Sequence, residues 1–82
     1  MKHFGMQIVV IDNGFVHLGD CTLQDGLLTI DNCRNLRVWG TSKGLSELCT
    51  GPTATTVADD CGTVLVPLAR VVFFLKVVRG WA

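Results

Sequence analysis

Two dipeptides, Asn13-Gly14 and Asp25-Gly26, constrain the fold of this chain more than any other feature of its sequence. Their residue types tolerate positive φ, so each dipeptide favours a tight hairpin turn when apolar runs flank it. The flanking runs, MQIVVID, FVHLGDCTLQ and LLTID, are rich in β-branched and apolar residues. The first third of the chain is therefore predicted to be a three-stranded antiparallel meander.

A fourth strand is predicted after a break in the apolar pattern at Asn32 and Cys33. The run RNLRVW has period-two alternation, which places Arg37 and Trp39 on the same face of that strand. Beyond Gly40 the period changes, and this change predicts the end of the strand.

A short helix is predicted at about 44–50. Its apolar residues follow the i, i+3, i+4 spacing of one helical face: Leu45, Leu48 and Cys49. Gly44 stands at the N-cap position, and Glu47 stands where a capping-box acid would. Gly51 followed by Pro52 is typical of a helix stop.

The last third is predicted to be a polar surface loop over 53–62 followed by two strands, TVLVP and RVVFFLKVV. Pro67 marks a bend or an edge position between these strands. Together these elements predict a single domain over 1–82 of mainly β class. It is a small antiparallel sheet or partly open barrel with one short helix.

The apolar content predicts a homo-oligomer. Of 82 residues, 49% are hydrophobic and only 17% are charged, so a monomer of this size would leave apolar side chains in water. Phe73 and Trp81 are the predicted subunit anchors. Arg70 and Lys76 lie an even number of positions apart on the final strand, so their side chains are predicted to lie on the same face. There they either protect an edge from aggregation or line a positive pocket shared between subunits.

Charge and hydropathy exclude several partners. The formal net charge is zero, which fits neither a protein that binds duplex DNA through its phosphates nor an acidic DNA mimic. The run TVLVPLARVVFFLKVV is shorter than the ~20 residues of a spanning helix and contains a proline and two cations, so no membrane partner is expected. The start of the chain lacks the pattern of a signal peptide, which favours the reduced cytoplasm.

The titratable residues give little indication of catalysis or metal binding. Four cysteines without a Cys-x-x-Cys pair are interpreted as structural thiols, with a zinc site or disulfides as the alternatives. His17 lies out of step with the apolar residues of its strand and is expected to face solvent or a partner. Asp59 and Asp60 are interpreted as solvated loop carboxylates. We therefore expect no enzyme activity, no metal and no cofactor.

The segment CRNLRVWGTSKGLSELCTGP, followed by Cys61 and LVP at 65–67, resembles a family of short proteins encoded by bacteriophages and prophages and classed as a domain of unknown function. The shared pattern is an arginine, an aliphatic residue and a tryptophan, then glycine, GLSEL, glycine, cysteine and Val-Pro. One departure is Gly44, where the family often has serine. The resemblance implies a small soluble phage accessory protein that acts inside an infected bacterial host.

The same segment contains the candidate ligand site. Arg37 and Trp39 lead into the predicted helix start, where Thr41, Ser42, Lys43 and Gly44 would offer backbone amides, hydroxyls and an ammonium to a phosphate. Trp39 would stack on a base and Arg37 would pair with a second phosphate. The alternative is that Trp39 serves packing and that the glycines make a tight turn. The spacing is not that of a Walker A loop.

These features suggest a non-enzymatic phage protein that counters host antiviral defence. In the leading hypothesis an oligomer binds and sequesters an anionic nucleotide signal, of the cyclic or ADP-ribose type. One alternative is a protein-binding inhibitor of a host defence complex, comparable to anti-CRISPR proteins. The other is a structural protein of the virion or of its assembly.

Overall fold

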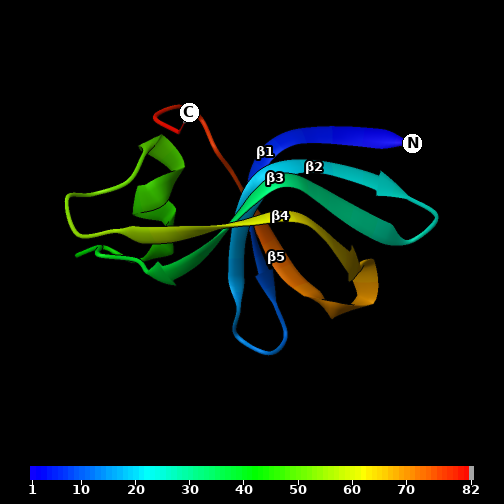
Figure 1. Ribbon diagram of the computed structural model, residues 1–82, viewed down its shortest axis with the longest axis horizontal. Helices are drawn as coiled ribbons and strands as arrows, with labels where there is room; N and C mark the ends of the chain where they lie inside the picture. The colour runs from blue at the N-terminus through cyan, green and yellow to red at the C-terminus, as the bar shows by residue number, and fades with distance from the viewer. Residues whose placement is uncertain (82) are drawn as a thin grey trace.

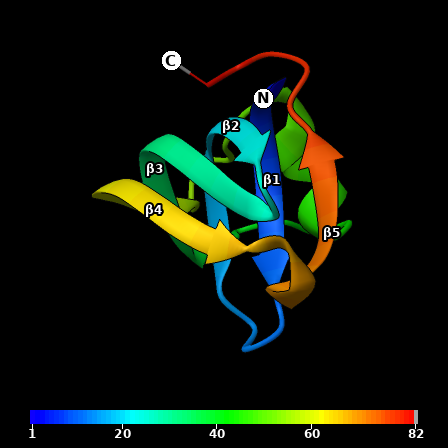
Figure 2. The same ribbon diagram turned by 90° about the vertical axis from the view of Figure 1, so that its right-hand side faces the viewer.

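The computed structural model describes residues 1–81 as one five-stranded antiparallel sheet, with strand order β4-β3-β2-β1-β5 (Figure 1). The strands are β1 (Lys2–Ile11), β2 (Val16–Gln24), β3 (Leu27–Val38), β4 (Val57–Pro67) and β5 (Val71–Lys76). Two 3-10 segments, η1 (Leu45–Thr50) and η2 (Leu68–Arg70), complete the fold. The predicted mainly β class is confirmed. The sheet is open, and β4 and β5 form its two edges (Figure 2).

Both predicted hairpin turns are present, so the meander of β1, β2 and β3 is also confirmed. Only Asp25 and Gly26 separate β2 from β3, and both have positive φ, 53° and 75°. A two-residue turn of this handedness matches the twist of the strands that it joins. At the first turn, Asn13 uses its side-chain oxygen to accept a hydrogen bond from the backbone N–H of Phe15.

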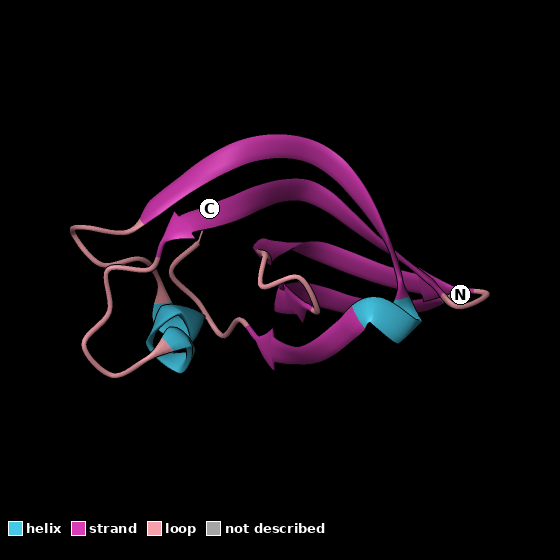
Figure 3. Ribbon diagram, turned by 90° about the horizontal axis from the view of Figure 1, so that it is seen from below, coloured by secondary structure: helices cyan, strands magenta, loops and turns pink. Residues whose placement is uncertain are grey.

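The predicted break at Asn32 and Cys33 is a β-bulge within one continuous strand, β3. The register with β4 shifts on both sides of Cys33, and Asn32 has a φ of 50°. Because the extra residue changes the side-chain alternation, Ile30 and Cys33 both point into the same apolar cluster. The bulge bends the sheet strongly, so that the strands arch over one face (Figure 3).

Gly19 of β2 permits the close approach of this bulge. A Cβ built at Gly19 would lie 2.5 Å from Cγ2 of Ile30, 2.7 Å from the backbone oxygen of Asp31 and 3.2 Å from Cα of Cys33. Only a residue without a side chain fits at this point, and β2 therefore has a glycine where it faces the bulge.

The predicted surface loop over 53–62 is wrong from Val57 onward, because β4 begins there. Small and acidic residues made this segment look like a loop. It is an edge strand, and a charged edge strand resists pairing with other chains. Its pairing with β3 is the most extensive in the sheet and includes Asn35 with Asp59.

The predicted helix at 44–50 is a 3-10 segment, η1, rather than an α-helix. Gly44 precedes it with a φ of 96°, and no side chain caps it. The Glu47 carboxylate bonds Ser42 instead of capping the first turn. The segment between Gly44 and Gly51 holds too few residues to repay the nucleation of a longer helix. Gly51 ends it, as predicted, with its N–H bonded to the oxygen of Leu48.

Apolar side chains form two clusters, one on each face of the bent sheet. One cluster is built around Val9, Cys21, Leu28, Ile30, Cys33 and Val66. The cluster on the other face is built around Ile8, Val16, Leu18, Leu36, Leu45 and Leu48. Trp81, which follows β5, packs on this second cluster beside η1 (Figure 1). Residues far apart in sequence therefore cover this face of the sheet.

The final strand is shorter than the predicted run of residues 70–78. Arg70 lies in η2, ahead of β5, and its side chain pairs with Asp12 at 3.1 Å. Arg70 and Lys76 therefore do not share one face of a strand as predicted. Pro67 is at the predicted bend, since β4 ends there and η2 follows.

Candidate functional site

A surface hollow of about 560 Å³ brings together the two strongest candidates from the sequence, Arg37 and Trp39. The hairpin turn between β1 and β2 supplies Phe15, and the edge strand β4 supplies Asp59. The remaining lining residues are Gly14, Val16, Asn35 and Leu36. Phe15 is 57% exposed and Trp39 is 40% exposed, so two aromatic rings are accessible at one site. Pockets of this volume accommodate ligands of nucleotide size.

Arg37 is held at the hollow by an ion pair. Its Nε donates a hydrogen bond of 2.8 Å to Oδ2 of Asp59, and this bond and the carboxylate charge raise the pKa of Arg37 above its ordinary value. Both side chains are more than half exposed, 65% and 51%. Solvent screens an exposed pair of this kind, so the pair contributes little to stability and leaves Arg37 available to an incoming anion.

Thr41, Ser42, Lys43 and Gly44 do not line this hollow. Ser42 donates from its backbone N–H and from its hydroxyl to the Glu47 carboxylate, at 3.3 and 3.4 Å. A carboxylate therefore occupies the place where the sequence pattern predicts a phosphate. The Lys43 side chain is exposed at this turn.

Trp39 enters the hollow from a loop that threonine hydroxyls hold in place. Thr56 donates a hydrogen bond of 2.6 Å to the backbone oxygen of Trp39, and Thr53 donates one of 2.7 Å to that of Gly40. Neither the backbone of Trp39 nor that of Gly40 belongs to a strand. The loop is therefore anchored from the segment that leads into β4.

The predicted interface residues lie in different environments. Phe73 is 45% exposed on the edge strand β5, and Lys76 is exposed at the end of that strand. Trp81 is half-buried against η1, and its Nε1 donates a hydrogen bond of 2.7 Å to the backbone oxygen of Leu48. The Arg34 guanidinium lies 5.7 Å from the centre of the Trp81 ring.

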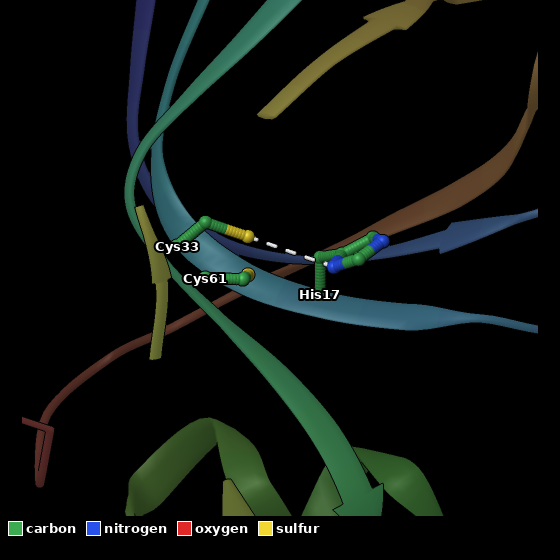
Figure 4. A group of neighbouring side chains, drawn as sticks. All are labelled: His17, Cys33 and Cys61. Carbon is green, nitrogen blue, oxygen red and sulfur yellow. Dashed lines mark hydrogen bonds between the residues drawn. The ribbon is translucent and has the colours of Figure 1, made fainter. Parts of the chain in front are cut away.

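A second group of functional side chains, which the sequence did not reveal, comes from three adjacent strands: His17 of β2, Cys33 of β3 and Cys61 of β4 (Figure 4). Cys33 Sγ and His17 Nδ1 are 3.6 Å apart, and one ligand atom from each of the three residues lies within 4.8 Å of the others. His17 is buried, contrary to the expectation that it faces solvent. Phe15 lies edge-on to the His17 ring, so this group adjoins the hollow.

Burial sets the protonation of this group. Burial lowers the pKa of His17, while burial and the neighbouring Cys61 thiol raise the pKa of Cys33 to about 12. Both effects favour the neutral forms, a thiol beside a neutral imidazole. An activated cysteine nucleophile has the opposite pair, a thiolate beside an imidazolium.

No protein-family model, no curated protein and no solved structure matches this chain. Among the helical segments of residues 1–81, none has the length and apolar character needed to cross a membrane.

Proposed function

We propose that this protein is a non-enzymatic binding protein that takes an anionic nucleotide into the hollow formed by Phe15, Arg37 and Trp39. The observation that carries the proposal is the convergence of two exposed aromatic rings and one guanidinium on a hollow of about 560 Å³. Base–aromatic stacking contributes about 1–3 kcal/mol per base, and a guanidinium binds phosphate through paired hydrogen bonds.

The resemblance to small phage and prophage proteins supports a biological setting for this binding. In that setting the ligand is an anionic nucleotide signal of bacterial antiviral defence, of the cyclic or ADP-ribose type, and the protein sequesters it. Sequestration requires affinity and no chemical step.

The binding experiment compares wild-type protein with Arg37→Ala and Trp39→Ala by isothermal titration with a cyclic dinucleotide and with ADP-ribose. We expect each variant to lose affinity about tenfold or more, because each removes one stacking or charge-assisted contact. Arg79→Ala is the matched control, since Arg79 is an exposed arginine outside the hollow. Circular dichroism checks that each variant is folded.

Asp59→Asn is expected to change the nucleotide affinity in the opposite direction. Because Asp59 competes with an anion for Arg37, removal of its charge is expected to increase nucleotide affinity. The proposal is wrong if neither nucleotide binds the wild-type protein, or if Arg37→Ala and Asp59→Asn leave the affinity unchanged.

We further propose that the protein acts as a homo-oligomer. Large apolar side chains are exposed on the edge strand β5 and on the β4–η2 segment: Val72 and Phe73 on the first, Leu65 and Leu68 on the second. Edge strands with exposed apolar residues pair readily with other chains, and a second copy has the same open edges.

Light scattering coupled to size-exclusion chromatography measures the oligomeric state. We expect a mass above that of one 8.9 kDa chain, and we expect Phe73→Asp to shift the protein to the monomer, because a charge would be buried at the contact. Lys43→Asp, which places the same charge at an exposed turn remote from β5, is the control. A wild-type monomer at micromolar concentration, together with co-purification of a host protein, would favour the protein-binding inhibitor instead.

A further inference from the structure

We infer that His17, Cys33 and Cys61 form a binding site for a zinc ion. The inference is independent of nucleotide binding. It rests on the geometry of three side chains, each of a type that binds zinc. Their spacing in the sequence gives no reason to expect that they meet.

The distances fit zinc closely. Zinc binds thiolate sulfur at about 2.3 Å and histidine nitrogen at about 2.0–2.1 Å, with tetrahedral angles. Such a centre separates a sulfur from a nitrogen by about 3.6 Å and two sulfurs by about 3.8 Å. Cys33 Sγ and His17 Nδ1 are 3.6 Å apart, and the three ligand atoms all lie within 4.8 Å of one another. The pair of Cys33 and His17 already has the required separation, and shifts of up to about 1 Å in the other two separations would complete the site.

The bulge in β3 is what brings the ligands together. In a regular strand Cys33 would point to the face opposite that of Ile30, because the two residues are three positions apart. The shifted register turns Cys33 inward, toward His17. Across the same irregular stretch, Gly62 of β4 has a φ of 73° and pairs with Cys33, which leaves Cys61 beside it. Bulges often redirect a side chain at a functional site in this way.

Exposure provides a route for the ion. His17 and Cys33 are buried, whereas Cys61 is exposed on the edge strand. An ion can therefore enter from the side of Cys61 and be enclosed by the other two ligands. Each thiol loses its proton to solvent when its sulfur binds the metal. Three protein ligands leave one tetrahedral position for water or for a donor atom of a ligand.

A bound ion would connect β2, β3 and β4, and β4 is an edge strand that pairs with β3 alone among the described strands. Zinc is therefore expected to stabilise the edge against local opening, because it binds the folded arrangement and not the separated strands.

The experiment uses the full chain, reduced and freed of metal by a chelator, and titrates it with Zn²⁺ and with Co²⁺. We expect one equivalent of Zn²⁺ to bind and to raise the Tm. The Co²⁺ form is expected to show the intense visible bands of tetrahedral coordination and the near-ultraviolet sulfur-to-metal charge transfer of two thiolates.

Cys61→Ser is the decisive variant, because Cys61 is exposed and its loss leaves the core unchanged. We expect it to weaken Zn²⁺ binding by about 100-fold or more and to reduce the charge-transfer band by half. Cys49→Ser, which changes a half-buried cysteine outside the group, is the matched control and is expected to bind Zn²⁺ normally.

Two outcomes would overturn the inference. One is a reduced wild-type chain that binds no Zn²⁺ or binds it equally well after Cys61→Ser. The other is a Co²⁺ form that lacks the sulfur-to-metal charge-transfer band, which would mean that no thiolate binds the metal.

Discussion

Trp81→Ala is expected to reduce the free energy of unfolding by about 3 kcal/mol, at the low end of the range for truncating a large core aromatic because Trp81 is half-buried. The indole packs on the cluster formed by Leu48 and its neighbours, and its N–H bonds the Leu48 backbone oxygen at 2.7 Å. A domain of this size has a total stability of roughly 4–12 kcal/mol. Urea denaturation followed by circular dichroism measures the loss.

Trp39→Ala is the matched control for this prediction, because the chain has only these two tryptophans. Trp39 is 40% exposed at the hollow, so its removal is expected to change stability by about 0.5 kcal/mol or less. Trp81→Phe separates the two contributions of Trp81. It retains most of the packing and loses about 1 kcal/mol with the hydrogen bond. Equal effects of the two alanine variants would mean that Trp81 does not hold the C-terminal segment on η1.

The strands and turns of the first half were predictable because their signals are local. A dipeptide such as Asp25-Gly26 determines its own turn by its φ preferences, and the apolar runs on both sides have no other short connection. The end of η1 at Gly51 was predictable for the same reason. The 3-10 form of η1 was not, since its spacing of apolar residues is the same as that of an α-helix turn.

β4 was only partly predicted, because the evidence for its first half lies in another strand. Asp59, Asp60 and Gly62 have low β-propensity by themselves, yet each pairs with a residue of β3. A strand that forms through pairing rather than through its own preferences leaves no pattern in a single sequence. The buried position of His17 depends on the same pairing, because β3 and the bend of the sheet enclose it.

The candidate hollow was predicted in part. Arg37 near the end of β3 and Trp39 in the loop just beyond it do reach one site. Phe15 comes from a turn more than twenty positions earlier, and no local pattern connects it to them. The group of His17, Cys33 and Cys61 is even less predictable from the sequence. Its members are separated by 16 and 28 positions, and their meeting depends on a bulge that shifts the register of β3. Sequence periodicity assumes regular strands, so it gives no indication that Cys33 faces His17.

Gly40→Ala is expected to be strongly destabilising for so small a change, with a loss of about 2–4 kcal/mol in the free energy of unfolding. Gly40 has a φ of 67°, a conformation that costs alanine about 1 kcal/mol or more. A Cβ there would also lie 2.5 Å from Thr55 Oγ1, 2.7 Å from the Thr55 carbonyl carbon and 2.7 Å from the Thr56 backbone nitrogen. Two of these three atoms are backbone, so the loop itself would have to move, and overpacking of this kind costs about 1–3 kcal/mol.

Gly14→Ala isolates the contribution of close packing at Gly40. Gly14 also has positive φ, 89°, but a Cβ there meets nothing within 4 Å, so only the backbone cost of about 1 kcal/mol is expected. The difference between the two variants in urea denaturation therefore measures how tightly Thr55 and Thr56 hold the loop that carries Trp39. Because the same contacts position Trp39 at the hollow, Gly40→Ala should also weaken nucleotide binding. Equal stability of the two variants would show that the threonine segment does not fix the loop, and that Trp39 reaches the hollow without this support.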